Sequence, residues 1–316
     1  MHIGMGLVCG NKIRDMMGAG FKFIIYLADW HAWINNKLEG KMENIRASGE
    51  YFKECFAGLG LSGVKYVWAS ELAKDIEYWE KVVRIAKRLS INRVWRALPI
   101  MGRSMDAKDV ESAAVFYPCM QAADIFYMNV DVACAGIDQR KVHMLARDVA
   151  EKLKWKKPVC LHTHLLAGLS GPAEKLEGAY DENPEVNLQI KAKMSKSIPR
   201  DSIFVHDSPE EIREKVRVAF CPPKEAKFNP VLEMAKYAIF PAVKSFKLIR
   251  PMKYGGETVY ESYEELEEDY AKGLVHPLDL KVSVSEALIK LLEGVRRRFK
   301  ENPNPLKAVL SLRITR

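Results

Sequence analysis

The chain has 316 residues, of which 48% are hydrophobic and 28% are charged. This length and composition are typical of a globular protein with a large buried core, and they favour two domains over one. The sequence has no uninterrupted apolar stretch long enough to cross a membrane and no signal-peptide pattern, so we expect a cytoplasmic protein. A formal charge of +8 makes a nucleic-acid partner plausible without establishing one.

The cysteines of this chain are spread along it without any C-x-x-C pair, and most lie in apolar segments. This pattern predicts buried free thiols, and it excludes the usual spacings of zinc ligands. The cysteines are Cys9, Cys55, Cys119, Cys134, Cys160 and Cys221.

Short apolar, β-rich runs alternate with helical patterns as far as Val205. Such alternation predicts an α/β fold with a doubly wound, Rossmann-like parallel sheet. The helical stretch of roughly 75–105 is too long for one crossover and predicts an inserted helical pair, a common place for a partner or dimer surface. The expected strands are Phe21–Ala28, Lys65–Trp68, Val130–Cys134, Pro158–Leu161 and Ser202–Val205.

The end of the Rossmann-like region is marked by strong helix signals. Ser208 followed by Pro209 and Glu211 predicts a capped helix that runs to about Phe220. The Cys221-Pro-Pro segment then breaks the chain, and helical patterns follow at 261–272 and 282–300. We therefore expect a catalytic domain at 1–222 with a helical insertion at about 71–116, and an all-α domain at 223–316.

A glycine-rich turn, His2-Ile3-Gly4-Met5-Gly6, leads directly into a helical pattern at 7–17. Glycines let a triphosphate approach the backbone closely, and an imidazole at the start of a helix can donate to phosphate oxygen. The signal is weak alone, because glycines before helices are common in structures without nucleotides. In a doubly wound fold a strand precedes such a helix, so we expect the site to lack its first strand.

The segment Lys193-Met194-Ser195-Lys196-Ser197 lies between two expected strands. Two lysines on a loop could close over a triphosphate and neutralise the departing pyrophosphate, although an isolated K-x-x-K is more often a solvated basic loop. The five residues are identical to the KMSKS motif of class I aminoacyl-tRNA synthetases, and His2–Met5 resembles their HIGH motif, with Met5 in place of the second histidine. The resemblance implies catalytic roles for His2, Gly4, Lys193 and Lys196, and ATP binding by these residues together with Met5, Met194 and Ser195.

Three polar residues of the next helical segment, Tyr117, Gln121 and Asp124, lie at i, i+4 and i+7 and so share one face. An amphipathic helix that turns its polar side to solvent would give the same periodicity. Gln139, however, follows an expected strand at its carboxyl end, where sheets of this kind bind ligands. These four side chains could therefore converge on a ligand.

The segments at 117–124, 130–133 and 138–147 resemble the tyrosine pocket of archaeal and eukaryotic cytosolic tyrosyl-tRNA synthetases. The resemblance implies that Tyr117, Gln121 and Gln139 hold the α-amino group of tyrosine, and that Asp124 accepts a hydrogen bond from the phenolic hydroxyl. Phenylalanine would leave that acceptor unpaired, a discrimination for which this enzyme class is a standard example. The family's second hydroxyl ligand, a tyrosine on the first strand, would precede Met1.

The segment at 27–32 resembles the end of the family's second strand, which places His31 in the same pocket; taken alone, His31 would be a core histidine. The segments at 250–256 and 276–281 resemble the family's anticodon-binding elements. That resemblance implies stacking by Tyr254 and base-edge recognition by Asp279 with His276, although a simple turn before a helix would also explain His276. Arg140 is implied at the first base pair of the acceptor stem.

The resemblance implies a tyrosine–tRNA ligase that uses L-tyrosine, ATP and tRNA(Tyr). It also implies a homodimer formed partly through the inserted helices, with Mg²⁺ carried by ATP and not by a dedicated protein site. Two alternatives remain open. A tryptophanyl-tRNA synthetase should not present the predicted tyrosine-pocket residues, and a non-catalytic tRNA-binding relative would account for Met5 and the expected loss of the first strand.

Overall fold

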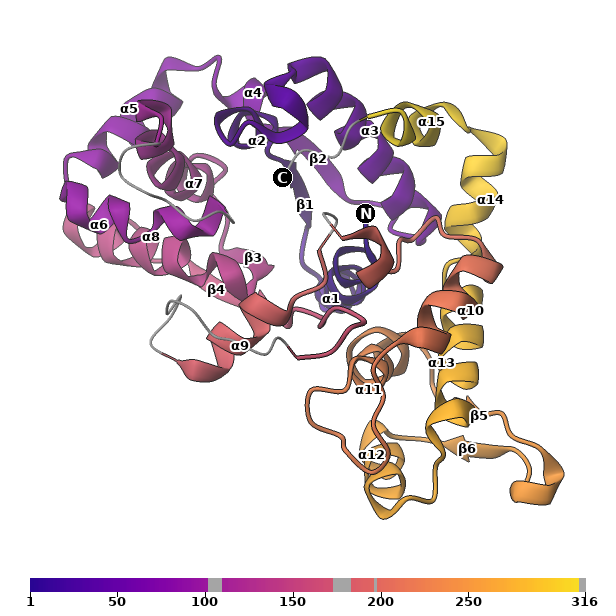
Figure 1. Ribbon diagram of the computed structural model, residues 1–316. Coiled ribbons are helices and arrows are strands. Elements are labelled where there is room, and N and C mark those ends of the chain that lie inside the picture. The colour runs from indigo at the N-terminus through magenta and orange to yellow at the C-terminus, as the bar shows by residue number, and fades with distance from the viewer. Residues whose placement is uncertain (102–109, 173–182, 196–197, 313–316) are drawn as a thin grey trace.

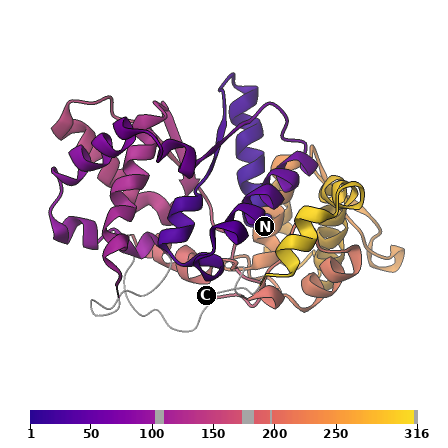
Figure 2. The same ribbon diagram turned by 90° about the horizontal axis from the view of Figure 1, so that it is seen from above.

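The computed structural model describes residues 1–101, 110–172, 183–195 and 198–312. Figure 1 shows the N-terminal strands at the centre, the inserted helices on one side, and the C-terminal helices below and to the right. The view from above separates the same two groups, with the N-terminal segments between them (Figure 2). None of the described helices is both long and apolar enough to cross a membrane.

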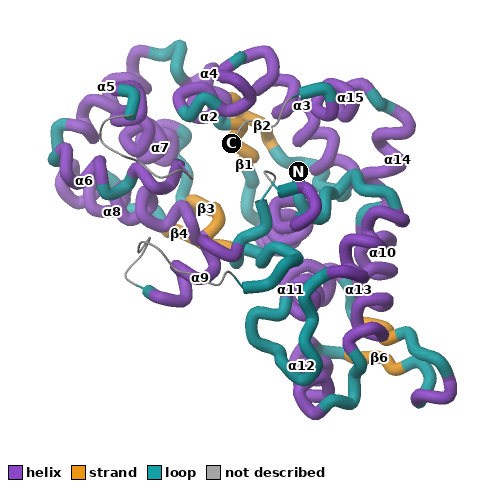
Figure 3. Tube along the Cα trace, in the orientation of Figure 1, coloured by secondary structure: helices purple, strands orange, loops and turns teal. Residues whose placement is uncertain are grey.

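The strands of the first half form parallel pairs, as the sequence predicts. β1 (Ile24–Leu27) pairs with β2 (Lys65–Trp68), and β3 (Val132–Gly136) pairs with β4 (Val159–Thr163). Within the described residues the two pairs are separate sheets. The strands are short and helices dominate the trace (Figure 3).

The fifth expected strand, Ser202–Val205, is wrong. Only Phe204 pairs there, in an isolated antiparallel bridge with His2. The 3₁₀ helix η6 (Pro199–Asp201) ends immediately before it, and Asp207 Oδ2 accepts the backbone N–H of Phe204 at 2.8 Å. A turn at each end leaves too few residues for a strand.

Helices connect the strands of each pair and form the insertion. α5 packs against α7, and the expected helical stretch is divided into α5 and α6, with its last residues outside the described ranges. The elements between β1 and β2 are α2 (Asp29–Ile34), η2 (Lys37–Gly40) and α3 (Met42–Gly58). Those between β2 and β3 are α4 (Ala69–Leu72), α5 (Ile76–Ala86), α6 (Ile91–Trp95), η3 (Leu98–Met101), η4 (Ser112–Val115) and α7 (Phe116–Tyr127). Those between β3 and β4 are η5 (Ile137–Gln139) and α8 (Arg140–Leu153).

The glycine-rich N-terminus is helical from Gly4 onward. A π-helical turn, η1 (Gly4–Cys9), continues into α1 (Gly10–Gly18). The segment at 203–205 lies against it, because Ile3 N–H donates to Ile203 O at 2.9 Å and a Cβ on Gly6 would lie 2.5 Å from Val205 Cγ1. Glycine at position 6 is therefore required for this close approach.

The expected all-α character of the region at 223–316 is wrong in one respect: the region is mainly helical but contains a short antiparallel hairpin, β5 (Phe246–Leu248) with β6 (Thr258–Tyr260). The expected capping box of Ser208 and Glu211 is confirmed at the start of α10 (Pro209–Val218). The other elements are α9 (Pro184–Ala192), α11 (Pro230–Met234), η7 (Ala235–Ile239), η8 (Phe240–Ala242), η9 (Met252–Tyr254), α12 (Tyr263–Lys272), α13 (Pro277–Leu291), α14 (Glu293–Glu301) and α15 (Asn304–Leu310).

One hydrophobic core joins the N-terminal helix, α3 and the C-terminal helices, and a second core lies under the inserted helices and α8. In the first core, α3 and α14 approach so closely that a Cβ on Gly58 would lie 2.6 Å from Val295 Cα. All the cysteines are free thiols; Cys55 and Cys119 are buried and the others are partly exposed, so the prediction of buried thiols holds only for these two.

Candidate active site

Asp124 lies at the centre of the expected pocket, on the inward face of α7. Its side chain is only 4% exposed, and its Oδ1 accepts hydrogen bonds from Tyr26 Oη at 2.8 Å and from Tyr78 Oη at 2.9 Å. Burial raises the pKa of Asp124 to about 7, and the two phenol donors oppose that rise because they stabilise the charged form. A carboxylate is thus held in a nearly dry environment by hydroxyl donors.

His31 faces the other oxygen of this carboxylate. Its Nε2 lies 3.3 Å from Asp124 Oδ2, and the Tyr117 ring packs edge-on against the imidazole at 4.9 Å. Among the described residues neither His31 nitrogen nor Asp124 Oδ2 has a hydrogen-bond partner. Burial lowers the pKa of His31 to about 4, so the imidazole is neutral and carries one N–H at neutral pH.

Gln121 and Gln139 meet on the same side of the pocket. Gln121 Nε2 donates to Gln139 Oε1 at 3.1 Å, and Gln121 Oε1 is buried without a described partner. Gln139 reaches this position because η5 follows β3 directly. The structure therefore brings together the expected pocket residues Tyr117, Gln121, Asp124 and Gln139 with His31, and the polar face of α7 is turned inward instead of toward solvent.

The glycine-rich turn is built around His2. The His2 ring lies over Gly4, where a Cβ would be 3.0 Å from its Cε1 and Nδ1, so the glycine makes room for the imidazole. The backbone of His2 pairs with Phe204, which follows the lysine loop. Met5 is partly buried against the main core, as expected for a thioether in place of an imidazole.

The lysine loop begins where α9 ends. Lys193 Nζ forms an ion pair with Asp138 Oδ2 at 2.7 Å, which attaches the loop to the residue next to Gln139. The Met194 side chain is buried, and the backbone N–H of Met194 donates to Leu166 O at 2.7 Å. Ser202 Oγ donates to Ser195 O at 2.7 Å, while Lys196 and Ser197 lie outside the described residues.

No three His, Cys, Asp or Glu side chains gather within the described ranges in a way that could hold a metal ion. The described part of the pocket contains hydrogen-bond donors and acceptors together with the ammonium group of Lys193.

The hairpin and the start of α13 lie next to each other in the C-terminal region. Tyr254 is 62% exposed, and Lys253 Nζ lies 4.7 Å from its ring centroid. Ile249 N–H donates to Ser283 Oγ at 2.7 Å, and this hydroxyl donates to Asp279 O at 2.7 Å, so the end of β5 is joined to the first turn of α13. The segment that follows β5 is thus tied to the helix that carries Asp279.

His276 and Arg140 lie at helix starts. His276 is the N-cap of α13, where Nδ1 accepts the Leu278 N–H at 3.2 Å; the turn-before-helix interpretation is therefore confirmed for its geometry. Arg140 is the first residue of α8 and is exposed. Arg140 directly follows Gln139 in the chain.

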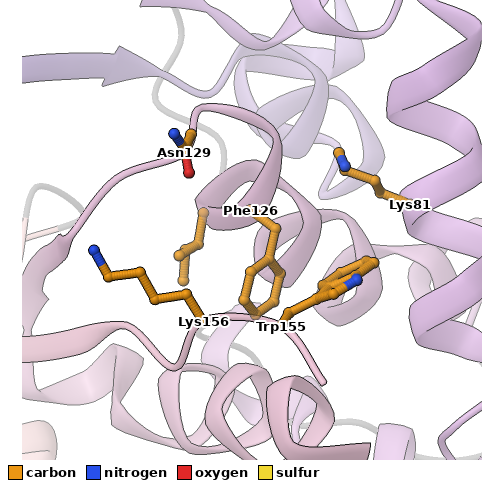
Figure 4. A pocket seen from close by; sticks show the side chains of 6 residues that line it. Lys81, Phe126, Asn129, Trp155 and Lys156 are labelled. Atoms are coloured by element: carbon orange, nitrogen blue, oxygen red, sulfur yellow. The ribbon is translucent and has the colours of Figure 1, made fainter. Parts of the chain in front are cut away.

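A hollow of about 190 Å³ in the N-terminal half of the chain is separate from this site (Figure 4). Its lining residues Asn129 and Lys156 precede β3 and β4, whereas Gln139 and His31 follow strands. The hollow is therefore at the amino ends of the strands, opposite the edge where parallel sheets bind ligands. Trp155 and Phe126, whose rings pack edge-on with centroids 4.9 Å apart, form part of the wall of the hollow.

Sequence reasoning missed three residues of the site. Tyr26 could have been noticed as the polar residue of an otherwise aliphatic strand, Ile24–Leu27. Tyr78 gave no signal, because its contact with Asp124 joins residues far apart in sequence. Asp138 lies in the segment at 138–147, but its ion pair with Lys193 depends on the position of the lysine loop, which the sequence does not give.

Comparison with known proteins adds independent information. The family described as tRNA synthetases class I (W and Y) matches residues 1–177 and 184–293. The tyrosine–tRNA ligase of Pyrococcus furiosus is 45% identical over 334 residues, covering 100% of this chain and 88% of that protein, and the one of Aeropyrum pernix is 47% identical over 312 residues, covering 98% and 84%. The crystal structure of a Pyrococcus horikoshii tyrosyl-tRNA synthetase complexed with L-tyrosine superposes with a TM-score of 0.90 at 42% identity, covering 99% of this chain and 88% of that one.

Proposed function

Because the chain belongs to the class I tRNA synthetases (W and Y), the family of the tryptophan and tyrosine enzymes, we propose that it is a tyrosine–tRNA ligase. The observation that carries the choice of tyrosine is Asp124, a buried carboxylate with one unpartnered oxygen at the base of the pocket. A phenolic hydroxyl would donate to that oxygen. The names of the similar proteins support the same substrate.

In the proposed reaction the carboxylate oxygen of tyrosine attacks the α-phosphorus of ATP, and pyrophosphate leaves. The hydroxyl of the terminal ribose of tRNA(Tyr) then attacks the tyrosyl carbonyl carbon of the adenylate, and AMP leaves. Neither step requires a covalent intermediate with the enzyme. Positioning of the reactants and neutralisation of phosphate charge would supply the acceleration.

Different residues of the pocket would bind different parts of the substrates. Gln121 Oε1 is a free acceptor for the α-amino group, with Gln139 and Tyr117 beside it. His2 and Gly4 at the helix start are suited to phosphate, as is the lysine loop, while the Met5 thioether packs against the core. Lys193 would leave Asp138 to reach the triphosphate, and Mg²⁺ would arrive on the phosphate oxygens.

The tRNA would be read at two places. Exposed Arg140, directly after Gln139 in the chain, is suited to the acceptor stem, and exposed Tyr254 with Asp279 is suited to stacking on a base and accepting from its edge. His276 would support this surface as the N-cap of α13. The activity would belong to the cytoplasm, where tRNA is charged.

A homodimer through the inserted helices is supported by their exposed apolar side chains. Ile76 is 80% exposed, Val83 is 54% exposed and Ile91 is 67% exposed, on α5 and α6. Exposed apolar side chains of this size would be buried in an interface between two copies of the chain.

The proposed function is tested by incubating the protein with labelled tyrosine, ATP and tRNA(Tyr), and by measuring the label in acid-precipitable RNA. ATP-dependent charging of tRNA(Tyr) supports the proposal. Charging with tryptophan instead, or binding of tRNA with no charging, would reject it in favour of one of the two alternatives.

A further inference from the structure

The two oxygens of Asp124 have different surroundings. Oδ1 accepts two phenolic hydroxyls, while Oδ2 has no hydrogen-bond partner among the described residues and faces a neutral imidazole at 3.3 Å. A buried carboxylate oxygen with no donor is costly, so this arrangement favours a ligand that brings one. A hydroxyl between Oδ2 and His31 could donate to the first and accept from the second.

Tyr26 and Tyr78 hold the carboxylate from two different parts of the fold. Tyr26 lies on β1, where it is fixed by the parallel register with Val67 and packs edge-on near His31 at 6.1 Å. Tyr78 lies on α5 in the insertion and is 1% exposed. Two donors on one oxygen restrict rotation of the carboxylate, so Oδ2 is kept on the side of His31.

We propose, on the basis of the proposed function, that Tyr26 is a specificity-determining residue of this site: together with Tyr78 it fixes Asp124 by Oδ1, so that Oδ2 beside His31 receives the hydroxyl of the amino acid. Tyr26 acts through Asp124 and is a positioning residue. His31 is the group that completes the hydroxyl site.

The opposite role for Tyr26 is also chemically possible. Its phenol is the same group as that of the substrate, so it could occupy the carboxylate and compete with the ligand. The two roles predict opposite changes in the affinity for tyrosine. Removal of the Tyr26 hydroxyl weakens tyrosine binding if it positions Asp124, and strengthens tyrosine binding if it competes.

The test compares Tyr26→Phe and Tyr78→Phe with wild type and with Tyr127→Phe. Tyr127 is a matched control, because it lies at the end of α7 and, like Tyr26 and Tyr78, donates a phenolic hydroxyl to a carboxylate. Its acceptor is Asp75 Oδ2, at 2.5 Å, and not Asp124. Affinities for tyrosine and phenylalanine are measured by calorimetry, and kcat/KM for both by ATP–pyrophosphate exchange. Thermal unfolding establishes that each variant is folded.

For Tyr26→Phe we expect kcat/KM for tyrosine to fall about tenfold while that for phenylalanine changes less than about twofold, because only the hydroxyl-bearing substrate uses Oδ2. Tyr78→Phe should give the same pattern, and Tyr127→Phe should behave as wild type. Equal losses for both amino acids, no loss, or tighter tyrosine binding in Tyr26→Phe would overturn the inference. If wild type itself shows no exchange with tyrosine, the proposed function fails first.

Discussion

Lys193 Nζ lies 2.7 Å from Asp138 Oδ2, so the first lysine of the loop is bound to the residue that precedes Gln139. Both side chains are partly exposed, so the pair can open without uncovering a buried charge. In this arrangement Asp138 and a bound triphosphate would compete for one ammonium group.

Asp138→Asn should therefore lower KM for ATP in the exchange reaction, by about threefold to tenfold, because the competing charge is removed. Lys193→Ala should raise KM for ATP, and it should reduce kcat by about 100-fold with KM for tyrosine nearly unchanged. Lys81→Ala, at the hollow on the opposite edge of the strands, is the control and should leave both parameters unaffected. A higher KM for ATP in Asp138→Asn would contradict this account.

Gln121→Leu should reduce affinity for tyrosine and phenylalanine by the same factor. The substitution removes the free amide oxygen that we assign to the α-amino group, and this group is common to both amino acids. We expect a loss of about tenfold to 100-fold in kcat/KM for each, because a charged donor loses its acceptor. A selective loss for tyrosine alone would place Gln121 at the hydroxyl end of the pocket instead.

Asp124→Asn should remove a pH dependence of stability. Burial raises the pKa of this carboxyl from 3.8 to about 7, so its contribution to the free energy of unfolding is complete below pH 3.8 and is lost as the pH rises through about 7. Relative to wild type, the variant should therefore gain roughly 2 kcal/mol between pH 5.5 and pH 8.

The groups that face Asp124 are Tyr26 from β1, His31 from α2, Tyr78 from α5 and Tyr117 from its own helix. None of these groups differs between wild type and Asp124→Asn, and His31 stays neutral above about pH 4. The difference in stability between the two proteins therefore reports the titration of Asp124 alone. Denaturant unfolding at several pH values measures the effect. A constant difference across this range would mean that the carboxyl does not titrate there. The same variant should lose the preference for tyrosine over phenylalanine, since an amide N–H would face the hydroxyl site.

Tyr254→Ala should raise KM for tRNA(Tyr) by about tenfold or more, because an exposed ring that stacks on a base is removed. Tyr254→Phe keeps the ring and should stay near the wild-type value. ATP–pyrophosphate exchange, which needs no tRNA, should be the same in both. An equal effect of the two variants on charging would assign the role to the hydroxyl and not to stacking.

Much of the fold follows from local signals in the sequence. The capping box at Ser208 and the apolar, β-rich runs of β1 to β4 depend on neighbouring residues, so they could be predicted. The segment at 202–205 also contains apolar residues, but the hydrogen bond from Phe204 N–H to Asp207 and the 3₁₀ turn before the segment decide its geometry. The hairpin β5–β6 is joined to α13 by contacts such as the hydrogen bond from Ile249 N–H to Ser283 Oγ. This contact links residues that are distant in sequence, so no local pattern predicts it.

Those parts of the site that lie on one helix or within one motif could be predicted from the sequence. Tyr117, Gln121 and Asp124 share a helical face, so their convergence followed from periodicity. The contacts of Asp124 with Tyr26 and Tyr78 join residues 98 and 46 positions apart, and only the tertiary structure brings them together. The same is true of Lys193 and Asp138, which are 55 positions apart.

ATP–pyrophosphate exchange with each of the twenty amino acids tests the central claim most directly, because it measures activation of the amino acid without requiring tRNA. We predict exchange with tyrosine, at least about 1,000-fold weaker exchange with phenylalanine, and none with tryptophan. Exchange that depends on tryptophan, or equal exchange with tyrosine and phenylalanine, would contradict the assignment of Asp124 as the acceptor of the substrate hydroxyl.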